Sequence, residues 1–166
     1  TQKSYPSWGY MIDNGATTVW ERWEVLRGLG MNSHNHLMLG TVDAWFYRTI
    51  AGIIPIEAGW KTIRIAPHLF DGMTHASASV DTVNGRVSSV WQRVDGELKL
   101  EVEIPVGSTA VIHIPCTHSC NDQAAQLYEQ GSKAKDAEGV LSVLHDEQHY
   151  VIEVGSGIYR FSLTDN

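Results

Sequence analysis

The apolar residues of this chain change their period near residues 53–58, and this change constrains the fold more than any other feature. From Trp60 onward they alternate with polar residues, a pattern typical of strands that bury one face. Turn-forming pairs such as Asn84-Gly85 and Asp95-Gly96 separate the alternating stretches. These stretches cover residues 60–65, 86–94, 98–104, 110–114, 149–154 and 158–163, with room for two or so more between them. The pattern predicts an antiparallel β-sandwich over residues 56–166.

The first 55 residues lack this alternation and predict helices instead. One helix is expected over about residues 18–27 and a second from about residue 35 to residue 51. Gly28 ends the first helix and Gly52 ends the second. Residues 1–14 are rich in aromatic side chains without a helical period, so an ordered loop is expected there.

The predicted helices are apolar over wide arcs, which suits packing between other helices. A helical segment of about 52 residues is too short to bury such faces alone, whereas about 110 residues of β-structure can fold independently. Residues 1–55 are therefore expected to be the closing part of a larger helical domain that lies upstream. Without that domain, their apolar faces should cause self-association or leave residues 1–50 mobile.

The charge distribution argues against two classes of partner. The net charge is −7; residues 1–55 hold four acidic and four basic side chains, and residues 56–166 hold fifteen acidic and eight basic ones. An acidic surface disfavours binding to nucleic acid or to an anionic membrane. No apolar run approaches the roughly 18 residues of a membrane span. Neither nucleic acid nor a membrane is an expected partner.

Cys116 and Cys120 lie close together, with His113 and His118 nearby. Cysteine and histidine are the usual zinc ligands, but the spacing differs from that of a zinc ribbon and no second cysteine pair exists. Two ordinary thiols are the favoured interpretation, and a short-loop disulfide stays open. The sequence predicts no metal and no cofactor.

A carboxylate flanked by aromatic residues is the strongest chemical signal in the chain. Glu21 lies in the run Trp20-Glu21-Arg22-Trp23, and Asn-Ser-His-Asn-His follows at residues 32–36. Indole faces pack against the apolar faces of sugar rings, and a fixed carboxylate can activate water during glycoside hydrolysis. Glu21 is therefore a candidate catalytic carboxylate of a glycoside hydrolase. The alternative is a structural carboxylate paired with Arg22 or another base.

Four further residues are candidates for contact with a sugar: Trp8, Trp20, Trp23 and His36. The indoles could equally pack in a core. His36 is a better candidate than His34, since a neutral imidazole can hydrogen-bond a sugar hydroxyl, although helix capping near Asn35 is a competing explanation.

Three motifs resemble the last part of the catalytic domain of bacterial α-L-rhamnosidases, glycoside hydrolase family 78. They are SYPSWGY at residues 4–10, GATTVWERW at residues 15–23 and MNSHNH at residues 31–36. The later sequence, with GSGIYRF at residues 155–161, is similar to the C-terminal β-sandwich of that family.

The resemblance implies an (α/α)6 catalytic barrel that releases terminal α-L-rhamnose with inversion of configuration. It implies that Glu21 is the general base and that His36 contacts the bound sugar. Since the general acid of the family lies upstream, the 166 residues alone should be inactive. The implied partners are rhamnose-containing glycosides and the missing upstream catalytic domain.

Two alternatives remain. The sandwich could be a non-catalytic module that binds carbohydrate or caps another domain, and the expected inward positions of Trp60 and Trp91 favour the cap. The enzyme could also be a related inverting glycosidase that acts on another sugar.

Overall fold

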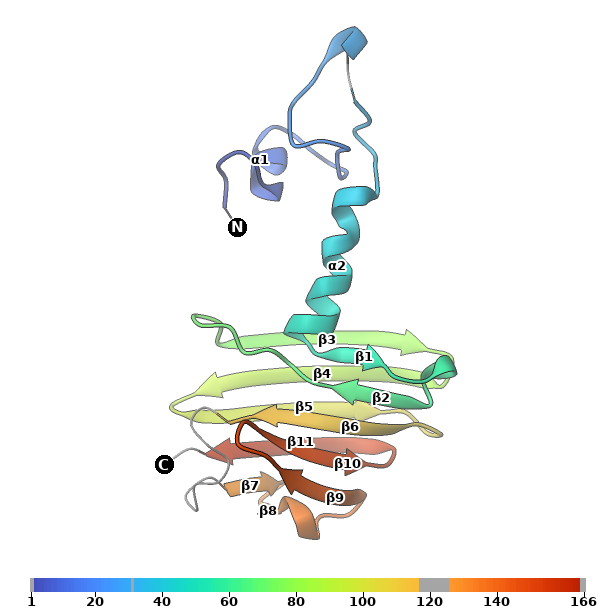
Figure 1. The fold of residues 1–166 in the computed structure, drawn as a ribbon, viewed down its shortest axis with the longest axis vertical. Coiled ribbons are helices and arrows are strands. Elements are labelled where there is room, and N and C mark those ends of the chain that lie inside the picture. Colours follow the sequence, from blue (N-terminus) through green and yellow to red (C-terminus); the bar gives the residue numbers. More distant parts are fainter. Residues whose placement is uncertain (1, 31, 117–125, 165–166) are drawn as a thin grey trace. The chain divides into compact units, whose positions relative to one another are not determined.

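The computed structural model describes residues 2–30, 32–116 and 126–164 (Figure 1). The chain divides into two compact units, Thr1–Trp45 and Phe46–Asn166.

The first unit is only partly helical. Its elements are the helix α1 Trp8–Asp13, the 3₁₀ turns η1 Gly28–Gly30 and η2 Met38–Thr41, and the short helix α2 Val42–Trp45. The expectation of a loop over residues 1–14 is wrong, because Ser7 caps α1 by accepting a 2.9 Å hydrogen bond from the backbone nitrogen of Tyr10.

The predicted helix over residues 18–27 is absent, and irregular chain with bends takes its place. The backbone there bonds to a distant segment: Glu21 N donates to Ser33 O at 2.9 Å, and His36 N donates to Val19 O at 2.8 Å. Threonine and valine lose side-chain freedom in a helix, so the run that begins at Thr17 has little helical preference to compete with this pairing.

The second predicted helix is present over a shorter range. Helical turns follow one another along the chain from Met38 through the π-helical stretch η3 Phe46–Ile50. Gly52 follows with φ of 77°, in the left-handed region that terminates helices. The predicted stop at Gly52 is confirmed, whereas the start lies at Met38 and not near residue 35.

The second unit consists of two β-sheets, which lie as two layers in Figure 1. One sheet has the order β1-β2-β6-β10-β9, with strands β1 Ile53–Pro55, β2 Thr62–Ile65, β6 Thr109–Pro115, β10 His149–Val154 and β9 Val140–His145. The other has the order β3-β4-β5-β11-β7-β8, with strands β3 His75–Thr82, β4 Gly85–Val94, β5 Glu97–Ile104, β11 Gly157–Thr164, β7 Gln126–Glu129 and β8 Ser132–Lys133. The 3₁₀ turns η4 Ala58–Trp60 and η5 Ala134–Asp136 lie between strands. β2 and β6 run parallel, and the other paired strands of the described residues run antiparallel.

The mostly antiparallel sandwich agrees with the fold class predicted from the alternating residues. The six expected strands are present as β2, β4, β5, β6, β10 and β11. The expectation of two or so further strands was too low, because β1, β3, β7, β8 and β9 also form. The small side chains of Ala76, Ser77, Ala78 and Ser79 give β3 little apolar contrast between its faces.

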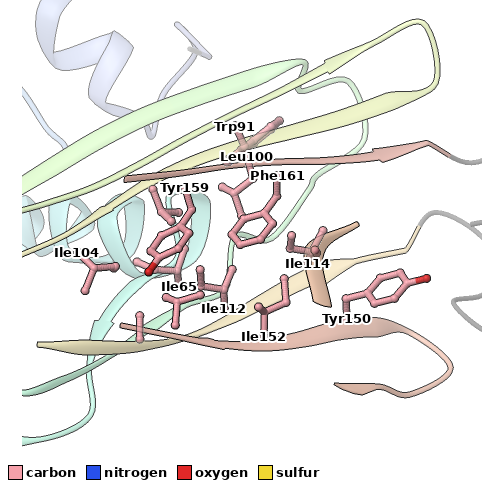
Figure 2. Packing of buried hydrophobic residues seen from close by; sticks show 14 of the residues in the cluster. Ile65, Trp91, Leu100, Ile104, Ile112, Ile114, Tyr150, Ile152, Tyr159 and Phe161 are labelled. Atoms are coloured by element: carbon pink, nitrogen blue, oxygen red, sulfur yellow. The ribbon is translucent and has the colours of Figure 1, made fainter. Parts of the chain in front are cut away.

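The core lies between the inner faces of the two sheets (Figure 2). Ile112, Ile114 and Ile152 face Trp91 and Phe161, and each of these side chains is at most 2% exposed. Full burial of one such side chain contributes roughly 1.5–3 kcal/mol. The prediction that Trp91 points inward is confirmed. Trp60 packs on the core only in part, since it lies in the turn η4 with a positive φ.

Cys116 is disulfide-bonded, so the interpretation of two ordinary thiols is wrong for this residue. Cys120 and His118 lie outside the described residues. Among the residues that are described, no group of three or more His, Cys, Asp or Glu side chains could hold a metal ion. None of the helices in this part of the chain has the length and hydropathy needed to cross a membrane.

Substituting Gly52 should destabilise the second unit strongly. A Cβ atom at Gly52 would lie 2.2 Å from the Ala66 carbonyl carbon and the Pro67 nitrogen, in addition to the cost of its φ of 77°. Gly52→Ala should lower the free energy of unfolding by more than about 3 kcal/mol, measured by urea denaturation.

Gly96→Ala is the matched control, because Gly96 has φ of 82° and nothing within 4 Å of the added atom. Its cost should be only about 1 kcal/mol, from backbone strain alone. Equal costs at the two positions would contradict the packing of Gly52 against residues 66–67.

Candidate active site

Two motif segments of the first unit lie alongside each other. Besides the two backbone hydrogen bonds between residues 19–21 and 33–36, the Thr18 hydroxyl donates to the His34 carbonyl oxygen. These bonds bring the Glu21 segment beside the His36 segment, although about twelve residues separate the two along the chain. Backbone pairing, and not a shared helix face, therefore positions the predicted site residues.

Two hydrogen bonds with Ser33, on the paired segment, hold Glu21 in place. Its backbone nitrogen donates to Ser33 O at 2.9 Å, and Ser33 N donates in return to its Oε2 atom at 3.0 Å. The residue is partly buried. Within the described residues, Oε1 of Glu21 has no hydrogen-bond partner and the carboxylate forms no ion pair with Arg22. The carboxylate is thus fixed through one oxygen, while the other can accept a hydrogen bond.

Trp8 and Trp23 form an aromatic pair. Their ring centroids are 5.2 Å apart and their planes cross at 78°, an edge-to-face arrangement. Nε1 of Trp8 donates to Leu39 O at 3.0 Å, which fixes the indole of this half-exposed residue. Two of the predicted sugar-binding residues are therefore in contact with each other.

Trp20 differs from the other candidates because it is only 3% exposed. Its indole stacks on the imidazole of His34, with 4.6 Å between the ring centroids and 19° between the planes. The burial favours a packing role for Trp20 in this chain.

His36 presents one defined nitrogen for binding. Its Nδ1 accepts a hydrogen bond from Met38 N at 3.2 Å, so in the neutral ring the proton lies on Nε2. The backbone contact with Val19 fixes the residue beside the Glu21 segment. His36 can thus offer an Nε2–H donor to a sugar hydroxyl.

Sequence reasoning missed two residues with unusual polar atoms. Both side-chain atoms of Asn32, and Nε2 of His34, are buried without a hydrogen-bond partner among the described residues. Leaving such a group unpaired costs about 1–3 kcal/mol, so these atoms mark positions where a further partner would be favourable. The sequence signal that could have identified Asn32 and His34 was their position in the Asn-Ser-His-Asn-His run.

Tyr5, from the first motif, lies near a second carboxylate. Its hydroxyl donates to Oε1 of Glu24 at 3.4 Å. Partial desolvation, and next the Glu24 charge, raise the pKa of Tyr5 above its ordinary value. The phenol therefore stays protonated and acts as a donor at neutral pH.

The Trp20–His34 stack can be tested by fluorescence quenching. His34→Ala should uncover the Trp20 indole and raise the fraction of tryptophan emission that acrylamide quenches. In a Trp20→Phe background, the same His34→Ala change should have no effect on quenching. A comparable rise in both backgrounds would show that His34 does not cover Trp20.

Two family models match successive parts of the chain. Residues 1–50 match the bacterial alpha-L-rhamnosidase 6 hairpin glycosidase domain, and residues 52–127 match the bacterial alpha-L-rhamnosidase C-terminal domain. The junction between them, at residues 50–52, falls where the structure changes from helix to strand.

Curated relatives agree with these models. An alpha-L-rhamnosidase from Streptomyces avermitilis is 36% identical over 98% of this chain, and one from Formosa agariphila is 36% identical over 96%. The chain spans only 15% and 17% of the length of these two relatives.

Solved structures give the same result. The alpha-L-rhamnosidase from Dictyoglumus thermophilum matches 99% of this chain with a TM-score of 0.87 and 41% identity. The Streptomyces avermitilis alpha-L-rhamnosidase complexed with L-rhamnose matches 97% with a TM-score of 0.77 and 36% identity. The chain covers 18% and 15% of these two structures. The chain therefore belongs to the bacterial alpha-L-rhamnosidase family and corresponds to part of its 6 hairpin glycosidase domain followed by its C-terminal domain.

Proposed function

We propose that the chain supplies the end of the catalytic barrel and the C-terminal β-sandwich of an inverting α-L-rhamnosidase. The enzyme would hydrolyse terminal non-reducing α-L-rhamnose from glycosides. The observation that carries the proposal is the Glu21 carboxylate, fixed at 3.0 Å by Ser33 N within a tryptophan-rich motif. The bound L-rhamnose of the Streptomyces avermitilis relative supports the choice of sugar.

Glu21 would act as the general base. In an inverting reaction, the base removes a proton from a water molecule as the oxygen of that water attacks the anomeric carbon. The glycosidic bond breaks on the opposite face, where a carboxylic acid protonates the departing oxygen. The two carboxyl groups typically lie about 6.5–9.5 Å apart, which leaves room for the water. We infer that Oε1 of Glu21 holds that water, because Oε2 already accepts the hydrogen bond from Ser33 N.

The aromatic residues and His36 would orient the sugar. The edge-to-face contact leaves part of the Trp8 and Trp23 surfaces for the apolar face of the pyranose, and Nε2–H of His36 would donate to a hydroxyl. Trp20 is buried against His34 and would support the fold of the sugar-binding segment. Any direct contact between Trp20 and the sugar would need His34 to move. Asn32 and His34 would pair their buried polar atoms with the sugar or with the rest of the barrel.

The rest of the barrel would come from sequence outside these 166 residues. Apolar side chains of the first unit are open to solvent, among them Ile12, Leu29 and Leu37 at 64%, 112% and 82% exposure. The relatives are several times longer than this chain, so they have the sequence needed to cover such residues. We infer that the general acid lies there too, and that the 166 residues alone are inactive.

The sandwich would serve as a structural cap and not as a carbohydrate-binding module. Binding of sugar on a β-sandwich face uses exposed aromatic residues, whereas Trp91, Tyr159 and Phe161 are at most 3% exposed. Among the described strands, no Trp, Tyr or Phe belongs to the large exposed residues.

The central test is hydrolysis of an aryl α-L-rhamnoside by the parent-length enzyme with Glu21→Gln. Turnover should fall by roughly a thousandfold or more with KM nearly unchanged, since the amide cannot accept the proton of water. Glu147→Gln, the same change at an exposed glutamate of the second unit, is the control and should keep full turnover. Unchanged turnover of Glu21→Gln would show that Glu21 is structural.

A second measurement tests whether Glu21 lies on the face of the sugar opposite the leaving group. Removal of the side chain in Glu21→Ala leaves room for azide, which needs no general base. Azide should restore turnover and yield the β-rhamnosyl azide, the product of attack on the face opposite the leaving group. An α-configured azide product would contradict inversion, and absence of rescue would contradict the proposed position of the water.

A further inference from the structure

A hollow in the second unit is lined by none of the candidate residues of the active site. Its volume is about 310 Å³, and its lining includes Arg48, Arg64, His68, His113 and His149. None of these residues belongs to the Glu21 motif or to the segment that pairs with it. The hollow therefore needs an explanation separate from rhamnose hydrolysis.

The register of the first sheet brings these side chains together. Arg64 of β2 lies beside Val111 of β6, and His113 lies two residues further along β6. His149 lies opposite Pro115 at the start of the neighbouring strand β10. Arg64 and His113 alternate with fully buried isoleucines on their strands, which places both on the outer face of the sheet.

Arg48 and His68 reach the same hollow from outside the strands. Arg48 belongs to η3, and His68 follows β2, with its backbone nitrogen donating to Thr49 O at 2.8 Å. This bond fixes the loop after β2 against the end of η3. Residues of η3 and of the loop after β2 therefore line the hollow together with the strand residues.

The charges that face the hollow are nearly all positive. No Asp or Glu belongs to its lining, and within the described residues neither Arg48 nor Arg64 has an ion-pair partner. Two unpaired guanidinium groups are unexpected where residues 56–166 carry fifteen acidic and eight basic side chains. An unpaired pair of arginines in a concave site favours an anionic ligand.

Two carboxylates, Asp146 and Glu153, lie on the same side of the sheet and partly offset the positive charge of Arg48 and Arg64. Oδ1 of Asp146 is 3.8 Å from Nδ1 of His149 and also accepts from the backbone nitrogens of Gln148 and His149. These backbone donors lower the pKa of Asp146, so it stays ionised. Glu153 lies in the same register row as Arg64, with Val111 between them, but outside the lining of the hollow.

The pKa of His113 reflects the charges around it. Burial, then the charges of His149 and Arg64, lower the pKa of His113 below its ordinary value of 6.5, against an opposing effect of Asp146. A bound anion would oppose the effect of the neighbouring positive charges and raise the pKa of His113. By linkage, anion binding should then strengthen as the pH falls toward the range in which His113 gains a proton.

We propose that this hollow binds an oxyanion, namely a carboxylate, phosphate or sulfate group, on a ligand no larger than about one sugar ring. The guanidinium groups of Arg48 and Arg64 can bind two oxygens of such a group, and the imidazoles can donate to the remainder. The free volume of about 310 Å³ is at the small end of ligand sites. The anion could be inorganic or could be the acidic group of a saccharide, and the choice of probes distinguishes these sources.

The experiment is a titration of the 166-residue chain, followed through the imidazole signals of His113 and His149 by NMR. The probes are inorganic phosphate, inorganic sulfate, glucuronate and, as the neutral match, glucose, at constant ionic strength. We expect saturable shifts with the anions but not with glucose. For sulfate and glucuronate, whose charges do not change between pH 6 and pH 8, binding should be about tenfold tighter near pH 6 than near pH 8. Equal affinities for glucuronate and the inorganic anions would indicate a general oxyanion site, whereas at least tenfold preference for glucuronate would indicate an acidic saccharide.

Arginine variants complete the test. Arg64→Gln should weaken binding about tenfold, and Arg64→Lys should recover part of the loss because charge returns without the planar fork. Arg160→Gln is the control, since Arg160 pairs with Glu101 at 2.8 Å on the other sheet. Absence of saturation with every anion, or an equal loss in Arg64→Gln and Arg160→Gln, would overturn the proposal. Neither result would bear on Glu21, because no residue of the hollow belongs to the candidate active site.

Discussion

The burial of one face of each sheet against the other is the interaction on which the second unit depends. It also determines where the helical segment ends. Nε1 of Trp91 donates to Ile50 O at 2.8 Å, and the buried hydroxyl of Ser89 donates to Ala51 O at 2.7 Å. Two side chains of β4 thus bind the carbonyl groups that η3 leaves unpaired at its end. The first turns of this unit are therefore held by hydrogen bonds from its core.

The first unit is organised in a different way. Its motif segments are joined by backbone pairing and by the reciprocal contact between Glu21 and Ser33, while only a few apolar residues, such as Met11 and Trp20, are fully buried. In the proposed function, a carboxylate held by one backbone donor, together with an imidazole and an indole pair from the same unit, would supply part of a glycosidase site. An acid on the opposite face of the sugar would have to come from sequence outside these 166 residues, and the relatives are several times longer than this chain.

The sequence predicted most of the sandwich because the signals there are local. Apolar and charged residues alternate strictly along β5 and more weakly along β6, and Asn84-Gly85 and Asp95-Gly96 mark the hairpin turns. The pairing of β2 with β6 depends on residues more than forty positions apart, so no local pattern could predict its parallel direction. The same limit explains the error at residues 18–27, where contacts with residues 33–36 outweigh local preference. At the site, Glu21 and His36 stand out by residue type, whereas the His34 stack on Trp20 exists only through the tertiary fold.

We infer that residues 1–45 complete a larger catalytic domain, while the sandwich folds on its own core. Amide hydrogen exchange can test this inference, by comparing the 166-residue chain with the parent-length enzyme at low concentration. Strands β4, β5, β6 and β11 should be strongly protected in both proteins. Amides of residues 2–30 and 32–45 should exchange quickly in the short chain and become protected in the long one. Equal and strong protection of those residues in the two proteins would show that they form a stable unit without further sequence.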